Sequence, residues 1–136
     1  MSSAKAEQMA KRITVDQLQS EIMGILNAYN ENVTDGTKDA VREVAKWGAN
    51  EVKAASRAAF NGRKYANGWT SQVETGRMSA QGAIYNGKLP GLPHLLENGH
   101  AKRNGGFVSG KTHIKPVEEQ VIKVFEETVR KNIEGA

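Results

Sequence analysis

The sequence predicts an α+β fold: two N-terminal helices, a small antiparallel sheet (a hairpin plus one or two short strands), a short helix and a C-terminal helix. Apolar residues recur at three- and four-residue steps in the first 60 residues and again near the C-terminus, as they do on buried helix faces. Between these regions, weakly alternating segments are separated by Asn-Gly dipeptides, which are typical of turns. All three histidines and all three prolines fall between residues 86 and 116, which marks that segment as irregular.

The composition indicates a single soluble domain. A length of 136 residues suits one domain, and we expect a flexible tail over residues 1–12 and one domain over residues 13–136. The absence of cysteine excludes disulfides and thiolate chemistry. Since no apolar run approaches the ~20 residues of a membrane span and the N-terminus lacks the apolar centre of a secretory signal, we expect a protein made in the cytoplasm.

The first two helices are predicted over about residues 15–30 and 37–60. Thr14 and Gln17 have the spacing of a capping box at the start of the first helix. Its apolar stripe comprises Val15, Leu18, Ile22, Leu26, Tyr29 and Val33. Gly62 is expected to end the second helix in a left-handed conformation. Four basic residues lie on the outer side of that helix: Arg42, Lys46, Lys53 and Arg57. Their alternation with carboxylates favours a solvated face.

Two strands are predicted over residues 69–74 and 80–85, joined as a hairpin. A short helix follows over residues 92–98, with Pro93 in its first turn and Gly99 as its left-handed end.

Residues 100–110 are predicted to form a loop, and Phe107-Val108 and His113-Ile114 are candidates for one or two further short strands. Pro116 begins the last helix, where a missing N–H has no cost. Acidic residues in its first turn and basic residues in its last turn suit the helix dipole. Its apolar stripe comprises Val117, Val121, Val124, Phe125, Thr128 and Val129.

The sequence contains no serine-nucleophile elbow, P-loop, dinucleotide-binding glycine pattern or zinc-protease motif. One group has the residue types of a metal site: His94, Glu97, His100 and His113. Its spacing is not that of a known metal site. We therefore favour a local hydrogen bond or salt bridge from Glu97, with the histidines as partly exposed polar residues. No catalytic residue, metal or cofactor is predicted, and a small metal-dependent hydrolase is a distant alternative.

The glycine-rich loop is the predicted contact element. Lys102, Arg103 and Lys111 surround its glycines, and Phe107 is its aromatic residue. Basic side chains on an adaptable loop suit phosphate or carboxylate groups of a neighbour, and the net charge of +4 agrees with such a partner. An ordinary solvated loop is the alternative. Aromatic residues do not alternate with the basic ones, so we expect no reading of a base sequence.

The segment from Leu92 to His100, followed by the loop and His113-Ile114-Lys115-Pro116, resembles the phage tail-component family typified by the gene-ten product of a lambdoid phage. The matching residues are Leu95, Leu96, Glu97, Gly99, His100, His113 and Pro116. The resemblance implies an α+β structural protein of a long-tailed phage, located in the tail or neck of the virion. It implies a role in tail completion or head–tail joining, without catalysis or cofactor.

The resemblance also implies partners. Members of this family form a ring, usually of six copies, around the DNA channel and contact neighbouring neck, tail-terminator or tape-measure proteins. We therefore expect a homo-oligomer, a hexameric ring, with non-specific contact to the DNA in its lumen and no contact with a membrane. The alternative is a basic nucleic-acid-binding regulatory protein that uses the helix from Thr37 to Phe60 and the basic loop.

Overall fold

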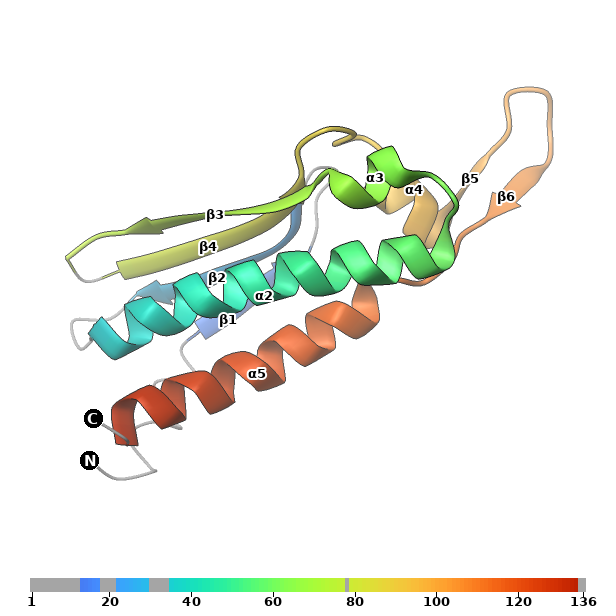
Figure 1. Cartoon of the computed structure of the whole chain (residues 1–136). Coiled ribbons are helices and arrows are strands. Elements are labelled where there is room, and N and C mark those ends of the chain that lie inside the picture. The colour runs from blue at the N-terminus through green and yellow to red at the C-terminus, as the bar shows by residue number, and fades with distance from the viewer. Residues whose placement is uncertain (1–12, 18–21, 30–34, 78, 135–136) are drawn as a thin grey trace.

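The computed structural model describes residues 13–17, 22–29, 35–77 and 79–134, which form the α+β fold predicted from the sequence (Figure 1). The strands are β1 (Ile13–Gln17), β2 (Ile22–Tyr29), β3 (Trp69–Thr75), β4 (Ser79–Asn86), β5 (Gly99–Ala101) and β6 (Phe107–Ser109). The helices are α2 (Asp35–Ala59), α3 (Arg63–Asn67), α4 (Pro93–Asn98) and α5 (Lys115–Glu134). The tail predicted over residues 1–12 lies outside the described residues.

Four strands form an antiparallel sheet in the order β1-β2-β4-β3. β3 and β4 are the predicted hairpin, in which Trp69 pairs with Asn86 and Val73 with Gly82. Alternate residues of β4, from Ala80 to Asn86, are buried, while the residues between them are partly exposed. This alternation is typical of an antiparallel sheet with one face against the core.

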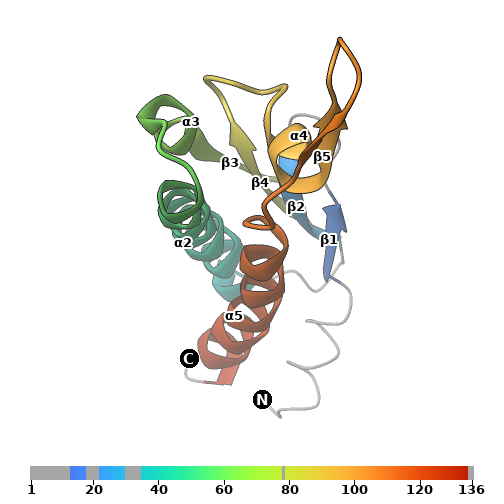
Figure 2. The ribbon, with the colours of Figure 1, turned by 90° about the vertical axis from the view of Figure 1, so that its right-hand side faces the viewer.

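α2 and α5 cover that face as an antiparallel pair (Figures 1 and 2). Their ends meet where the Asn132 side-chain amide donates a hydrogen bond of 2.9 Å to the Gly36 carbonyl. The buried stripe of α2 includes Ala40, Val41, Val44, Ala45, Gly48, Ala49 and Val52. The buried stripe of α5 includes Val117, Val121, Phe125 and Val129. Because both stripes follow the helical repeat, the two helices and the sheet enclose one core.

The helix predicted over residues 15–30 is wrong, because β1 and β2 occupy this region. The two strands pair antiparallel, with Val15 opposite Leu26, and β2 also pairs with β4. Ile22 and Leu26 are four residues apart, which is close to the helical repeat of 3.6, yet they pair with Tyr85 and Gly82 of β4, with an irregularity of the register between Ile22 and Gly24. The β-branched residues of this segment favour a strand, and pairing on both sides overrides the helical spacing.

The other predicted elements, α2, β3, β4, α4 and α5, are confirmed to within about two residues. Two details are wrong. Gly62 has a φ of −76° and precedes α3, a short helix that the sequence did not predict. His113 and Ile114 form no strand but are buried on the path into α5. Among the described residues, no helix has the length and apolarity to cross a membrane.

The irregular segments gather at one end of the molecule. α3, α4 and the β5–β6 hairpin lie near the end of α2 and the start of α5, and the hairpin projects away from helices and sheet (Figures 1 and 2). Gly99, where α4 turns into β5, has the positive φ predicted for it, +84°. A Cβ at this position would collide with the Val108 carbonyl oxygen. Only glycine therefore fits at the base of the hairpin.

Gly48 lies where α2 packs closely against β4 and α5 and gives a test of the packing. A Cβ at Gly48 would lie 2.6 Å from Cδ1 of Ile84 and 3.0 Å from Cγ2 of Val121. We expect Gly48→Leu to lower the free energy of unfolding by about 1–3 kcal/mol, because overpacking displaces neighbouring side chains. Denaturant titration followed by circular dichroism measures this. Asn50→Leu, at an exposed position of the same helix, is the control and should change stability by less than about 0.5 kcal/mol. Equal stabilities of the two variants would contradict this packing.

Candidate functional site

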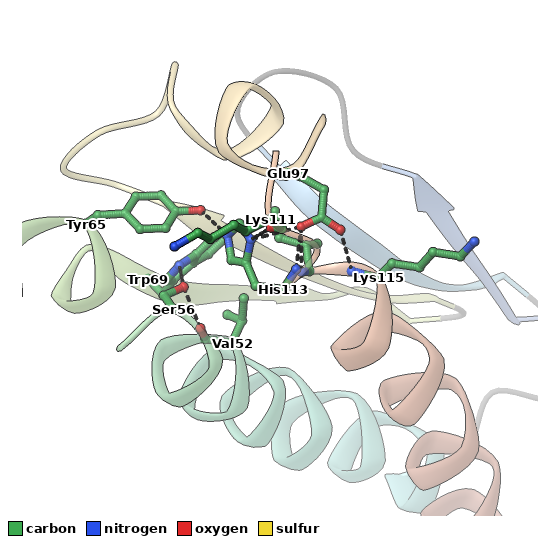
Figure 3. A network of polar contacts seen from close by, with 9 residues as sticks. Val52, Ser56, Tyr65, Trp69, Glu97, Lys111, His113 and Lys115 are labelled. Atoms are coloured by element: carbon green, nitrogen blue, oxygen red, sulfur yellow. Dashed lines mark hydrogen bonds and ion pairs between the residues drawn. The ribbon is translucent and has the colours of Figure 1, made fainter. Parts of the chain in front are cut away.

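Glu97, near the end of α4, caps the start of α5 (Figure 3). Its Oε1 accepts hydrogen bonds from the backbone N–H groups of His113 (2.7 Å) and Ile114 (2.9 Å), and Oε2 accepts one from Lys115 (3.0 Å). N–H groups at a helix start lack partners within the helix, and the partial positive charge there favours a carboxylate. The side chain of Glu97 therefore joins α4 to α5 across the whole hairpin.

His113 lies between Glu97 and Tyr65 and is 3% exposed. Its Nδ1 is 2.7 Å from the Lys111 carbonyl oxygen and 2.9 Å from Oε1 of Glu97. Both oxygens are acceptors, so Nδ1 carries a hydrogen. Nε2 lies 2.7 Å from the Tyr65 hydroxyl and, in the neutral ring, accepts its hydrogen bond. Both imidazole nitrogens are thus satisfied inside the protein.

Tyr65 of α3 connects this group to the core. Burial raises the pKa of its hydroxyl above the usual value, the nearby charge of Glu97 raises it further, and a hydrogen bond with Ser56 acts in the opposite direction. The Ser56 hydroxyl accepts a hydrogen bond from Nε1 of Trp69 (2.8 Å) and donates one to the Val52 carbonyl (2.7 Å). The buried side chains of Ser56 (α2), Tyr65 (α3), Trp69 (β3) and His113 (before α5) therefore all have hydrogen-bond partners inside the protein.

Tyr65, His113 and Glu97 have the hydrogen-bond order of a catalytic relay, but their surroundings are those of a core. A general base or nucleophile must reach its substrate, whereas Tyr65 and His113 are both buried. This arrangement is suited to holding helix ends together.

The four residues considered as metal ligands are not brought together. Within the described part of the chain, no group of three or more His, Cys, Asp or Glu side chains is placed to hold a metal ion. Glu97 and His113 contact each other, while His94 lies on α4 and His100 on β5. The local bond predicted for Glu97 is wrong, because its partners are 16 to 18 residues away in the sequence. The expectation of a partly exposed His113 is also wrong, because this histidine is buried.

The contact residues predicted for the loop lie on the projecting hairpin. Phe107 is 62% exposed and Val108 37% exposed, and Lys102 and Arg103 are exposed between the two strands. The Lys102 N–H donates to the Gly106 carbonyl at 3.0 Å, which closes the turn. The segment predicted as a loop over residues 100–110 is therefore an ordered hairpin that displays an aromatic and two basic side chains.

Lys111 differs from the other two basic residues. Its ammonium nitrogen lies 3.2 Å from the Ala59 carbonyl oxygen, at the end of α2, and 5.6 Å from the centre of the Phe60 ring. A lysine at this place satisfies a helix-terminal carbonyl and complements the helix dipole. Lys111 therefore belongs to the base of the hairpin, and Lys102 and Arg103 remain as contact candidates.

The residues that carry the family resemblance build the junction between α4, the hairpin and α5. Leu95 and Leu96 are half-buried on α4, and the Leu96 carbonyl accepts a hydrogen bond from the Lys111 N–H at 2.8 Å. Gly99 allows the turn at the base of the hairpin, and Pro116 lies in the first turn of α5. The resembling segment is thus a structural unit.

The basic residues on the outer side of α2 are partly engaged in local contacts. The Arg42 guanidinium lies 2.7 Å from the Asp39 carboxylate, with both side chains more than half exposed. Arg57 donates a 2.7 Å hydrogen bond to Oδ1 of Asn67. Exposed pairs of this kind add little stability, and they agree with the predicted solvated face better than with a nucleic-acid-binding stripe.

Sequence reasoning missed Tyr65, Ser56 and Asn86. Tyr65 is a single aromatic residue in a polar segment, which is a usable signal for a buried anchor. Asn86 belongs to one of the Asn-Gly dipeptides that predict turns, yet it is fully buried. Its Nδ2 donates to the Tyr65 carbonyl (2.8 Å), and its Oδ1 accepts from the Leu89 N–H (2.9 Å). Nothing in the sequence distinguishes this asparagine from one in an ordinary Asn-Gly turn.

Comparison with known proteins identifies one partial relative. No protein-family model matches the chain, and no solved structure matches it. DELTA-actitoxin-Oor1b of the sea anemone Oulactis orientalis is 32% identical over 66 residues, which are 48% of this chain and 38% of the toxin. The match therefore leaves more than half of each protein uncovered and does not define a family for this chain.

The comparison contradicts the predicted function. The relative that it identifies is an actitoxin and not a phage structural protein. The predicted role as a tail-completion or neck subunit of a long-tailed phage is therefore wrong. The resemblance to the tail-component family and the location in a virion stay predictions, because no family model tests them.

Removing the Glu97 carboxylate tests its capping role. We expect Glu97→Ala to lower the free energy of unfolding by about 2–4 kcal/mol, because three N–H groups lose a charged acceptor in a partly buried site. Glu97→Gln, which keeps one acceptor oxygen, should lose less. Thermal and denaturant unfolding measure both, with Glu126→Ala, at an exposed position of α5, as the control. A Glu97→Ala variant as stable as the control would contradict the cap.

Glu118, in the first turn of α5, gives a pH-dependent test. Burial, with the charges of Glu97 and Glu119, raises its pKa from 4.5 to about 7. Since the folded state holds this proton more tightly, its contribution to stability is present below pH 4.5 and is lost as the pH rises to about 7. Glu118→Gln should therefore be stabilised relative to the parent, with a difference in Tm that grows between pH 4.5 and 7 and then levels off.

Glu126→Gln is the control, because Glu126 is exposed two turns further along α5. Its difference in Tm from the parent should change little over the same pH range. A difference for Glu118→Gln that is equally independent of pH would contradict the raised pKa.

Proposed function

We propose that this chain is a structural subunit that assembles with copies of itself, and that the β5–β6 hairpin is its contact element. The observation that carries the proposal is the exposure of Phe107, 62%, on a hairpin that projects from the body. Aromatic residues make up only 6% of the chain. An aromatic side chain placed outside the core is typical of residues that anchor interfaces.

The construction of the hairpin base supports the same proposal. Glu97 and Gly99 fix the end of α4, and the N–H of Lys111, which follows β6, donates a hydrogen bond to the Leu96 carbonyl of α4. The two strands are therefore held at their base by several independent contacts. A projection held in place at its base loses less conformational entropy on binding than a free loop does.

Action by contact and not by catalysis is part of the proposal. Its support is the burial of Tyr65 and His113, which keeps both side chains away from a substrate in solution. The number of copies, six by the family resemblance, and contact with DNA stay predictions. Lys102 and Arg103 would suit a phosphate backbone as well as a carboxylate.

Hairpin variants test the proposal. We expect the purified protein to form a concentration-dependent oligomer in analytical ultracentrifugation. Phe107→Ser should reduce the association constant by about tenfold or more at all salt concentrations, because it removes buried apolar area. Lys102→Glu with Arg103→Glu should reduce association mainly at low salt, as expected for charges at the edge of an interface.

The fold should be intact in these variants, since all three residues are exposed, and unfolding curves check this. Thr70→Ser, on the exposed side of β3, is the control for association. A parent protein that stays monomeric at every concentration would contradict the proposal. If assembly persists in Phe107→Ser while the paired charge reversal abolishes DNA binding, the hairpin is a nucleic-acid contact instead.

A further inference from the structure

The hairpin carries two of the three large hydrophobic side chains that are most exposed in the described residues. They are Phe107 and Val108, adjacent on β6; the third is Ile122 on α5. β5 and β6 are only three residues long each, and an isolated pair of such short strands is marginally stable in water. The two strands alone therefore bury little of the apolar surface that Phe107 and Val108 present.

A groove of about 460 Å³ lies between α2 and α5. One wall consists of four alanines in the last turns of α2: Ala54, Ala55, Ala58 and Ala59. Pro116 and Val117 of α5 lie on the other wall. Small side chains on one helix and a proline on the other leave an apolar surface with space for a large side chain.

The charges of the groove and of the hairpin are complementary. Residues 99–109 contain Lys102 and Arg103 and no acidic residue. Glu51 lies at the groove and supplies a carboxylate, while the basic residues of α2 are not among the groove's lining residues. The remaining polar lining includes Gln120, which is able to bond to an exposed strand edge. An aromatic residue flanked by basic ones therefore suits this groove.

The hairpin of the same copy does not reach this groove. Thr112 and His113, which line the groove, follow directly after the hairpin. Phe107 precedes Thr112 by five residues, roughly 16 Å of extended chain at about 3.3 Å per residue. The hairpin also points away from α2 and α5 (Figures 1 and 2). A hairpin that occupies the groove must come from another molecule.

We propose that the β5–β6 hairpin of one copy docks into the α2–α5 groove of a second copy, with Phe107 against the alanines and Lys102 or Arg103 near Glu51. The inference rests on the proposed self-assembly and names the receiving surface. The hairpin and the groove are different surfaces of the same subunit. A row of docked subunits therefore has a free hairpin at one end and a free groove at the other. Such head-to-tail contacts close into a ring or continue as a filament.

Two complementary variants test the inference. Ala58→Arg blocks the groove with bulk and a repelling charge; Ala58 is exposed, and arginine near the end of a helix preserves the fold. Phe107→Ser removes the aromatic anchor but leaves the groove. Each variant alone should lose the oligomer, and an equimolar mixture should form a heterodimer that grows no further. Thr70→Arg, on the exposed side of β3, is the matched control and should assemble like the parent.

A photo-reactive phenylalanine analogue, p-benzoylphenylalanine, at position 107 locates the contact directly. In a mixture of isotopically labelled and unlabelled protein, we expect cross-links from position 107 to residues 51–59 or 112–120 of another copy. Cross-links to another hairpin or to the exposed face of the sheet would overturn the groove while leaving the proposed self-assembly intact. A parent protein that never assembles would overturn both.

Discussion

The structure depends on the contact between the Glu97 carboxylate and the first N–H groups of α5. Pro116 has no N–H, so the start of α5 offers the groups of His113, Ile114 and Lys115, and one side chain binds all three. The same oxygen that caps the helix also lies beside the His113 ring, which in turn contacts Tyr65. A single carboxylate therefore sets the start of α5, the orientation of a buried imidazole and the position of α3.

This interaction also explains the behaviour of the neighbouring acid. A carboxylate in the first helical turn is normally stabilised by the helix dipole, yet the pKa of Glu118 is raised to about 7. The N–H groups that would favour its charge are already bound to Glu97, and the negative charge of Glu97 adds repulsion to the effect of burial. The start of α5 therefore accommodates one carboxylate well and a second only at a cost.

The long, strongly periodic elements could be predicted from the sequence, while contacts distant in the chain could not. The stripes of α2 and α5 have a spacing that fits only a helix over their full length. Ile22 and Leu26 have a helical spacing, but pairing with β1 and β4 makes this segment a strand. The positive φ of Gly99 was predicted because this requirement is local, although its ψ of 174° is not that of a left-handed helix cap. Glu97 was expected to bond locally, because nothing in its sequence neighbourhood indicates that α5 begins beside it. Asn86 and Ser56 were missed for the same reason.

The base of the hairpin makes its contacts within the subunit, whereas the projecting part leaves apolar surface exposed. At the base, Glu97, Gly99, Lys111 and the Leu96 carbonyl each have a defined partner or a required conformation. At the projecting part, Phe107 remains mostly exposed although the core contains few aromatic residues. Burying a phenylalanine stabilises a folded protein by about 1.5–3 kcal/mol. The isolated subunit would therefore be more stable if Phe107 lay in its core. A firmly held base that presents an unsatisfied aromatic residue is therefore better explained by a contact outside the subunit than by the stability of the subunit itself.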